Sequence, residues 1–523
     1  MLARENLLPN AVARWAAETP DAVAVDFIGR RSLTYAELHD TGLRWAAALL
    51  RVGVTRGVHV ATMFSADLSA HFGMLGVGWT GAVEVPLNTA YQGAMLRYAI
   101  DLTDATVIVC SSEFVPVLAA VAGDLEKVER LVVVDGTAPA GAFACEVVDG
   151  DAFFAGIEPA EGLPGPEYHE ISTLLLTSGT TGPSKAVIVP WAGVFQMWSW
   201  VPGDALLPGE ALYIAMPMFH NSGRSGFNSC MARGGRCVTR DKFSGTEFWA
   251  DVRAHDCVLA ALVGPMTQLI YNADPRPDDA DNPLRGVVIG PMIPEMADFE
   301  RRFGVKVSTC YGQTEVGAPV TTDWDHGPPA CCGRARVDYP WIEVILADEF
   351  DQEVPVGEIG EMLVRSREPW SLNAGYYKMP EATATAWRNG WFHTGDAFKR
   401  DADGWFYFVD RMKDTIRRRG ENISSFEVEN AVVEFPDVLE CAAAGIRTAL
   451  GDDEVLIQVI VRDPAAFDPG ALIAFLDERM PKFMVPRYVE VVDDFPRNAT
   501  TGRVRKHELR ERGLTPATWD RLA

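Results

Sequence analysis

The segment Ser172–Pro190 of the chain, STLLLTSGTTGPSKAVIVP, predicts a strand, a tight loop and a second strand. Its apolar parts, Leu174–Leu176 and Ala186–Val189, enclose the glycine- and hydroxyl-rich loop Thr177–Lys185. Glycines let backbone N–H groups turn towards an oxyanion, hydroxyls can donate hydrogen bonds, and a lysine adds positive charge. The loop does not match G-x-x-x-x-G-K-[ST], the loop of the common P-loop NTPases. It therefore predicts an oxyanion site of another kind, with a flexible surface linker as the alternative.

The composition is typical of a multidomain globular protein. With 523 residues, of which 48% are hydrophobic and 23% charged, the chain should hold two or more domains. Its net charge of −25 argues against nucleic acids and anionic membranes as partners, because both require a basic face. Nine scattered cysteines form no C-x-x-C pair, and no apolar run is long enough for a membrane-spanning helix. We therefore expect a cytoplasmic, multidomain protein of the size of an enzyme, with reduced thiols.

Strands and helices alternate through the first part of the chain. The predicted strands are 23–27, 32–34, 58–63, 82–86, 105–110 and 131–134, and the predicted helices are 5–18, 35–52, 66–80 and 93–101. This alternation predicts a parallel, doubly wound sheet. Residues 135–169, rich in glycine, proline, alanine and acidic residues, predict a surface excursion.

The alternation resumes after the opening loop. Strands are predicted at 211–215, 258–263, 285–289 and 305–308, helices at 248–254 and 266–272, and a polar loop at 216–226. Strands dominate from about 333 to 410, which predicts a β-rich subdomain. We expect an α/β protein: an N-terminal domain, residues 1–410, with doubly wound αβα sheets and the β-rich subdomain, and a small α+β C-terminal domain, residues 411–523.

Three further motifs follow the opening loop in order. They are YGQTE (311–315), WFHTGD (391–396) and DRMKDTIRRRGENISSFEVE (410–429). Together the four motifs resemble the adenylate-forming superfamily, which includes acyl-CoA synthetases, peptide-synthetase adenylation domains and firefly luciferase. The resemblance runs from Leu33 to Lys506. The motifs TSGTTGPSK, PMFHN and RGENIS look most like those of crotonobetaine/carnitine and medium-chain or aryl-acid CoA ligases.

The resemblance implies a phosphate and metal site. The attacking carboxylate and the α-phosphate of ATP are both negatively charged and repel each other. The site must therefore neutralise charge and align the two groups. Glu315 is implied to bind Mg²⁺, with Thr181 nearby. One carboxylate together with substrate phosphates is a usual set of ligands for Mg²⁺. The residues implied to wrap the β- and γ-phosphates are Thr177, Ser178, Gly179, Thr180, Thr181, Gly182 and Lys185.

The nucleoside is implied to bind the second and third motifs. Tyr311, next to Gly312 and Thr314, offers a flat face for adenine. Asp396 can accept hydrogen bonds from both ribose hydroxyls, and Arg411 can donate to the same sugar. Taken alone, Tyr-Gly and Gly-Asp pairs are common in turns.

The acid is implied to bind beside the motif PMFHN (217–221). His220 matches a family position, aromatic or histidine, that borders the acyl group, and a packing histidine is the alternative. The polar residues that follow are unusual for a fatty-acyl pocket and favour a small polar or aromatic acid. The residues expected at the pocket are Phe219, His220, Asn221, Arg224, Gly264, Gly290 and Pro291.

The C-terminal part departs from the family pattern. Lys413 matches the hinge about which the small domain swings, and Arg417–Arg419 are implied to meet the phosphates of CoA, with a solvated surface as the alternative. The family ends in a Gly-Lys pair whose lysine bridges the carboxylate and the α-phosphate, but here Arg503 follows the glycine. Arginine keeps the charge and is bulkier. Either Arg503 takes the role, or Lys506 reaches in.

These features predict an AMP-forming ligase that activates a small-molecule carboxylic acid with ATP and Mg²⁺ and transfers it to CoA. The residues expected in catalysis are Thr181, His220, Glu315, Lys413 and Arg503. One alternative loads a separate carrier protein, and another is a diazotase-type enzyme that activates nitrite for an aryl amine. A nucleotide-binding protein without catalysis is disfavoured by the intact Glu315 and Asp396. A homodimer is among the expected assemblies.

Overall fold

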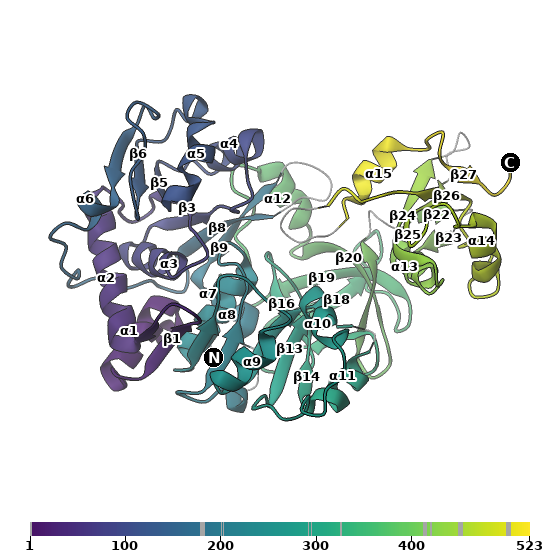
Figure 1. Cartoon of the computed structure of the whole chain (residues 1–523), viewed down its shortest axis with the longest axis horizontal. Helices are drawn as coiled ribbons and strands as arrows, with labels where there is room; N and C mark the ends of the chain where they lie inside the picture. The colour runs from purple at the N-terminus through teal and green to yellow at the C-terminus, as the bar shows by residue number, and fades with distance from the viewer. Residues whose placement is uncertain are drawn as a thin grey trace.

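The computed structural model shows a mixed α/β chain with a large N-terminal part and a smaller C-terminal lobe (Figure 1). The structure describes residues 3–177, 184–199, 201, 203–290, 292–293, 295–324, 327–411, 416–418, 421–447, 453–497 and 504–523. Among these residues, no helix combines the length and the apolar character needed to cross a bilayer.

The first sheet has the strand order β7-β6-β5-β3-β4-β8-β9. The strands are β3 (His59–Met63), β4 (Val83–Pro86), β5 (Val107–Cys110), β6 (Arg130–Val133), β7 (Glu146–Asp149), β8 (Ile171–Thr177) and β9 (Lys185–Pro190). All neighbours are parallel except β8 and β9, the antiparallel pair that was predicted to flank the glycine-rich loop.

Helices cover both faces of this sheet. Successive strand residues point to opposite faces, so Val60 and Ala61 belong to two different cores. The core on one side includes α2 (Tyr35–Arg51) and α3 (Ser69–Thr80), and the core on the other includes α4 (Gly93–Leu102) and α5 (Val115–Ala119). The predicted doubly wound arrangement is confirmed.

The prediction of a surface excursion over 135–169 is wrong for two elements, β7 and α6 (Gly150–Phe154). The carboxylate of Asp149 accepts the Ala152 N–H at 2.7 Å and caps α6. Both elements are short, and β7 is a half-exposed edge strand. They therefore leave no hydrophobic pattern that sequence reasoning can detect.

The second sheet has the order β14-β13-β12-β10-β11-β1-β2. The strands are β1 (Val23–Phe27), β2 (Ser32–Thr34), β10 (Ala211–Ile214), β11 (Arg236–Thr239), β12 (Cys257–Val263), β13 (Gly286–Gly290) and β14 (Lys306–Ser308). Only β1 and β2 are antiparallel. The helices α9 (Phe248–Ala254), α10 (Gly264–Tyr271) and α11 (Met296–Phe303) contribute to the core on one face.

The other face of the second sheet packs on α8 (Asn221–Ala232), where the sequence predicted a polar loop over 216–226. The prediction is wrong for 221–226, which belong to α8, whereas 216–220 lie outside helices and strands as predicted. Arg224, Ser225 and Asn228 of α8 are as deeply buried as its apolar residues. Because polar side chains occur on its buried faces, the helix lacks the amphipathic pattern by which a surface helix is recognised.

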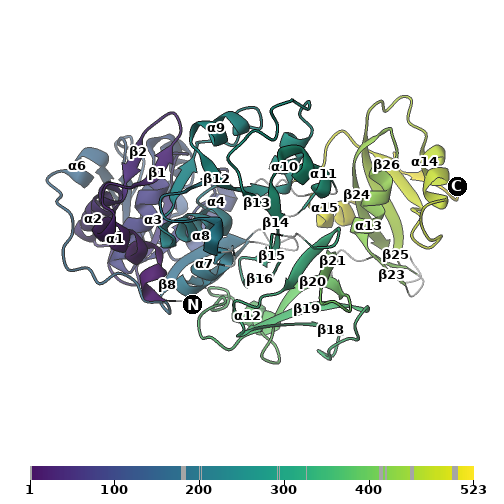
Figure 2. The same cartoon turned by 90° about the horizontal axis from the view of Figure 1, so that it is seen from below.

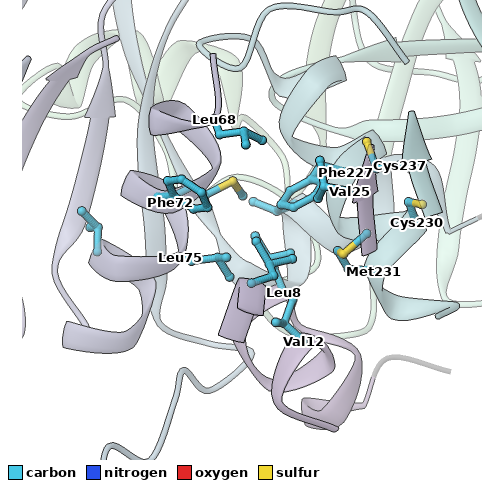
Figure 3. Packing of buried hydrophobic residues seen from close by; sticks show 14 of the residues in the cluster. Leu8, Val12, Val25, Leu68, Phe72, Leu75, Phe227, Cys230, Met231 and Cys237 are labelled. Atoms are coloured by element: carbon cyan, nitrogen blue, oxygen red, sulfur yellow. The ribbon is translucent and has the colours of Figure 1, made fainter. Parts of the chain in front are cut away.

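A single core joins the two sheets (Figure 3). Phe72 of α3 faces Phe227 and Met231 of α8, and Leu8 and Val12 of α1 (Leu8–Glu18) lie between the two helices. The two sheets therefore form one packed body in which α3 and α8 are central layers.

Residues 310–411 form a third sheet with the order β15-β16-β17-β21-β20-β19-β18, which confirms the predicted β-rich subdomain. The strands are β15 (Cys310–Gln313), β16 (Gly317–Thr321), β17 (Cys331–Ala335), β18 (Ile342–Ala347), β19 (Ile359–Ser366), β20 (Phe392–Arg400) and β21 (Phe406–Arg411). All neighbouring pairs are antiparallel. The helix α12 (Pro380–Ala386) precedes β20.

The C-terminal lobe has its own core and stands at one end of the molecule (Figure 2). Its sheet consists of β24 (Val438–Arg447), β25 (Asp453–Val461), β26 (Tyr488–Val491) and β27 (Trp519–Asp520), with the helices α13 (Ser425–Val433), α14 (Pro469–Asp477) and α15 (Lys506–Arg512). A separate hairpin joins β22 (Ile416–Arg418) and β23 (Glu421–Ile423). The α+β class is confirmed, while the boundary between residues 410 and 411 and the mobility of the lobe stay predictions.

Candidate active site

The predicted pocket residues gather at one edge of the second sheet. Its strands β10, β12 and β13 are parallel, so the segments that follow them leave at the same edge. Val263 at the end of β12 pairs with Gly290 at the end of β13, and Gly264 directly follows Val263. Ligands of open α/β sheets bind outside the carboxyl ends of the strands. This edge, with residues 216–220 after β10, is therefore the place where the fold can build a substrate site.

Asp396 is the centre of a buried polar cluster on the third sheet. Its carboxylate accepts hydrogen bonds from the Tyr311 hydroxyl at 2.6 Å and from the Gln313 amide at 2.8 Å. Arg411, its partner across β20 and β21, brings its Nε to 3.5 Å from the carboxylate. Burial and the charge of Asp396 raise the pKa of Tyr311 well above its usual range, so the hydroxyl keeps its proton. The four side chains, three of which were predicted to bind the nucleoside, form one connected group.

Gln313 is the member of this cluster that the sequence reasoning missed. Its amide also donates to the carbonyl oxygen of Thr394 at 3.0 Å. The signal was present, because residues two apart on a strand share a face, and Gln313 stands two residues after Tyr311 on β15. Alternation would have placed both side chains towards Asp396.

Gly312 and Thr314 belong to the tight connection of β15 and β16. A Cβ atom on Gly312 would lie 2.5 Å from the carbonyl oxygen of Gly317, so only glycine fits this close approach. Thr314 lies in the turn that joins the two strands. The turn sets the position of Glu315, whose carbonyl oxygen accepts two hydrogen bonds from Asn373, from the backbone at 2.9 Å and from the side chain at 2.7 Å.

Glu315 is a partly buried carboxylate that contacts Tyr376. The Tyr376 hydroxyl donates to Glu315 Oε1 at 3.1 Å, and the ammonium nitrogen of Lys185 lies 4.4 Å from the centre of the same ring. Burial raises the pKa of the Glu315 carboxyl, while the Tyr376 hydrogen bond and the charges of Lys185 and Arg411 act against this rise. A desolvated carboxylate gains from a nearby cation, and carboxylate oxygen is the ligand type that Mg²⁺ takes. The residue present therefore fits the expected metal ion.

Thr177 and Lys185 pair at the ends of β8 and β9, where the loop between them begins and ends. The Thr177 hydroxyl donates to the Lys185 carbonyl oxygen at 3.4 Å. The other predicted residues of the loop, Ser178, Gly179, Thr180, Thr181 and Gly182, lie outside the described residues, as do Pro291, Lys413 and Arg503.

His220 precedes α8 and carries a neutral imidazole. Burial lowers the pKa of His220 to about 4, and within the described part of the chain its Nε2 has no hydrogen-bond partner. The side-chain amide nitrogen of Asn221 is likewise buried without a partner there. The ring of Phe219 lies 4.9 Å from that of His220, centre to centre. These side chains leave uncharged polar atoms at the edge where the acid is expected.

Arg224 does not offer a free positive charge to the pocket. Its guanidinium lies 2.5 Å from the carboxylate of Glu84 on β4, and both side chains are buried. Glu84 also accepts the Thr62 hydroxyl at 2.7 Å, and Arg224 donates to the Met218 carbonyl oxygen at 3.2 Å. The pair links the two sheets. Its effect on the pocket is to hold the backbone at Met218.

Two basic residues of the C-terminal lobe are engaged inside it. Lys506 donates to Ser425 at 2.5 Å and forms an ion pair with Glu429 at 2.7 Å, while Ser425 donates to Asp410 at 2.7 Å. Arg418 is buried and pairs with Glu454 at 2.6 Å. Arg418 therefore lies in the interior of the lobe, contrary to the interpretation that it meets CoA.

The chain matches known families over most of its length. The family model "AMP-binding enzyme" covers residues 12–377, and the model "AMP-binding enzyme C-terminal domain" covers residues 427–501. The protein belongs to the AMP-binding enzymes. Among curated proteins, it is 29% identical over 497 residues to the crotonobetaine/carnitine–CoA ligase of Citrobacter koseri, covering 92% of this chain and 93% of the relative. It is 27% identical to the enzyme of the same name in Salmonella agona, with the same coverage.

Solved structures agree in fold. ATP-bound MatB from Rhodopseudomonas palustris is 26% identical, with a TM-score of 0.80 and coverage of 96% of this chain and 98% of that one. The o-succinylbenzoate CoA synthetase MenE from Bacillus subtilis, in complex with ATP and a magnesium ion, is 22% identical, with a TM-score of 0.82 over 96% and 99% of the two chains. The predicted adenylate-forming fold is confirmed.

Proposed function

We propose that this protein is an AMP-forming acid–CoA ligase that activates a small polar or aromatic carboxylic acid. The observation that carries the proposal is a pair of carboxylates: the buried Asp396 within its donor cluster, and the partly buried Glu315 beside Tyr376 and Lys185. The family membership and the crotonobetaine/carnitine–CoA ligases among its relatives support the same reaction. Crotonobetaine and carnitine are small polar acids.

In the first half-reaction, a carboxylate oxygen of the acid attacks the α-phosphorus of ATP, and pyrophosphate leaves. Asp396, with Tyr311 and Gln313 around it, holds and orients the nucleoside through its hydroxyls. Lys185 neutralises phosphate charge, and Glu315 would hold Mg²⁺, which supplies further neutralisation. Each group acts by position and charge, as the reaction of two anions requires.

In the second half-reaction, the thiolate of CoA attacks the acyl carbon of the adenylate, and AMP leaves. The acid itself is expected at the edge occupied by Phe219, His220 and Asn221, where the polar atoms are uncharged. An acid with an aromatic ring or a neutral polar group suits such walls better than a long alkyl chain. A carrier protein in place of CoA would use the same adenylate.

The experiment measures pyrophosphate and AMP release by the purified protein with ATP, Mg²⁺ and a panel of acids, with and without CoA. AMP release that requires both an acid and CoA supports the proposal. A further arm supplies nitrite with aminobenzoic or aminocinnamic acids, because a diazotase would respond there; the named relatives do not favour that outcome. Release of ADP would contradict adenylate formation altogether.

We further propose a cytoplasmic location, supported by the nine cysteines, which all lie in the described part of the chain and none of which forms a disulfide. A homodimer stays a prediction from the sequence.

A further inference from the structure

Tyr376 occupies a position that none of the predicted motifs covers. One side chain contacts two residues of the predicted phosphate and metal site: its hydroxyl lies 3.1 Å from Glu315 Oε1, and its ring centre lies 4.4 Å from the Lys185 ammonium. The side chain is almost fully buried, with 8% of the residue exposed. It therefore joins the carboxylate expected on the metal to the cation expected on the phosphates.

The backbone holds Tyr376 in this place. Residues 374–377 add on to β9, with hydrogen bonds from Ile188 N to the Gly375 oxygen at 2.9 Å and from Tyr377 N to the Ala186 oxygen at 2.8 Å. Gly375 has a φ of +102°, and a Cβ atom there would lie 2.7 Å from Thr383. The Tyr376 N–H in turn donates to the Thr383 hydroxyl at 2.9 Å. The segment that carries the ring is thus fixed to the strand that carries Lys185.

We propose that Tyr376 is a positioning residue that orients the Glu315 carboxylate for Mg²⁺ and keeps Lys185 beside it. The inference rests on the proposed use of Mg²⁺ and ATP at this site. Its hydroxyl donates to Glu315 Oε1 and so fixes the direction of the carboxylate, and its ring face attracts the ammonium of Lys185. Hydroxyl and ring thus have separable roles.

The separable roles define the variants. Tyr376→Phe removes the hydroxyl and keeps the ring, whereas Tyr376→Leu removes both. Tyr377→Phe is the matched control: it makes the same chemical change one residue along the chain, where the hydroxyl donates to Asp104 at 3.0 Å instead of to Glu315.

The measurement is calorimetric binding of ATP at a series of Mg²⁺ concentrations, which needs no knowledge of the acid. We expect Tyr376→Phe to raise the Mg²⁺ concentration for half-maximal binding about tenfold, the effect of one hydrogen bond to a charged group. Tyr376→Leu should in addition weaken ATP binding at saturating Mg²⁺, and Tyr377→Phe should match the wild type.

A double-mutant cycle completes the test. If Tyr376 acts through Glu315, the Tyr376→Phe change has no further effect on Mg²⁺ dependence in a Glu315→Gln background. An unchanged Mg²⁺ requirement in Tyr376→Phe, or equal shifts in Tyr376→Phe and Tyr377→Phe, would overturn the inference. If wild-type protein binds Mg²⁺ and ATP but releases no AMP with any acid, the proposed function fails while the role of Tyr376 remains measurable.

Discussion

Asp396 shows how much a single residue contributes to the nucleotide end of the site. Its carboxylate is buried, accepts from Tyr311 and Gln313, and lies near Arg411. A buried acceptor of this kind fixes the directions of all its donors. The orientation of the carboxylate that we propose to receive the ribose is therefore set before ATP binds.

Replacing Asp396 by alanine should raise the KM for ATP at least tenfold, because the ribose loses its acceptor and the Tyr311 hydroxyl loses its partner. Steady-state kinetics at saturating acid and CoA measure the effect. An unaltered ATP requirement would show that Asp396 does not contact the sugar.

Glu315 gives the sharper prediction for catalysis. Glu315→Ala removes the carboxylate expected on Mg²⁺, and AMP release should fall by about 100-fold or more, the usual cost of losing one charge-stabilising group. The assay is AMP release under saturating substrates, with thermal unfolding as the folding control. Wild-type turnover in a folded Glu315→Ala protein would show that the metal lies elsewhere.

His71 of α3 predicts a dependence of stability on pH. Burial lowers the pKa of His71 to about 4, whereas an unfolded histidine titrates near 6.5. Below about pH 6.5 the unfolded chain binds a proton that the folded chain excludes, so stability falls as the pH drops towards 4, by up to about 3 kcal/mol. His71→Phe, beside the ring of Phe227, should flatten this part of the stability curve in urea titrations. A curve with the wild-type slope would contradict the assignment.

At the scale of elements, the Arg224–Glu84 pair connects α8 to β4. Both side chains are buried, and the two residues come from helix and strand layers of different sheets. Removing one partner of such a pair leaves an uncompensated buried charge, whereas removing both does not. The pair therefore stabilises the packing of the two sheets against each other only while both residues are present.

Arg224→Met should lower the free energy of unfolding by about 3–5 kcal/mol, and the double change Arg224→Met with Glu84→Gln should recover most of that loss. The exposed pair Arg97–Asp124 is the matched control, since Arg97→Met should cost less than about 1 kcal/mol. Urea denaturation measures all three variants. Equal losses at Arg97 and Arg224 would contradict the role of burial.

At the scale of the whole molecule, the contacts of Lys506 distinguish it from Arg503, the other basic residue considered for adenylation. Lys506 is bound to Glu429 and Ser425 of its own lobe, so it keeps these partners wherever the lobe is placed. Burial raises the pKa of Glu429, and Lys506 acts against that rise. Lys506 is therefore needed as a structural partner, which leaves Arg503 as the residue to test for adenylation.

Arg503→Ala should slow adenylate formation by about 100- to 1000-fold, the range for losing one transition-state donor. Lys506→Met should change the same rate only a few-fold while lowering the melting temperature of the lobe, because Glu429 is left buried without its cation. Acid-dependent exchange of pyrophosphate into ATP, together with calorimetry, distinguishes the two. A folded Lys506→Met protein without exchange would assign the role to Lys506.

The sequence by itself determined the alternating sheets, the β-rich subdomain, the α+β lobe and the order of the motifs. Buried parallel strands such as β5 are short, continuous apolar runs, and helices such as α2 carry a clear stripe, so their periods are visible in the chain. The motif residues Tyr311, Asp396 and Arg411 could be named because their motifs resemble those of a known family. Only Asp396 and Arg411 lie on neighbouring strands, β20 and β21.

Only the tertiary structure decided what pairs across long distances. The sequence predicted a loop where α8 lies, because its polar residues are satisfied by partners such as Glu84, 140 residues away along the chain. From the sequence, the charges of Lys506 and Arg418 were expected to be available to substrates. In the structure they form ion pairs with Glu429 and Glu454. No sequence pattern pointed to Tyr376, because its position depends on the hydrogen bonds of residues 374–377 to β9. Periodicity reports which face of an element is buried, and it carries no information about which distant charge or hydroxyl that face meets.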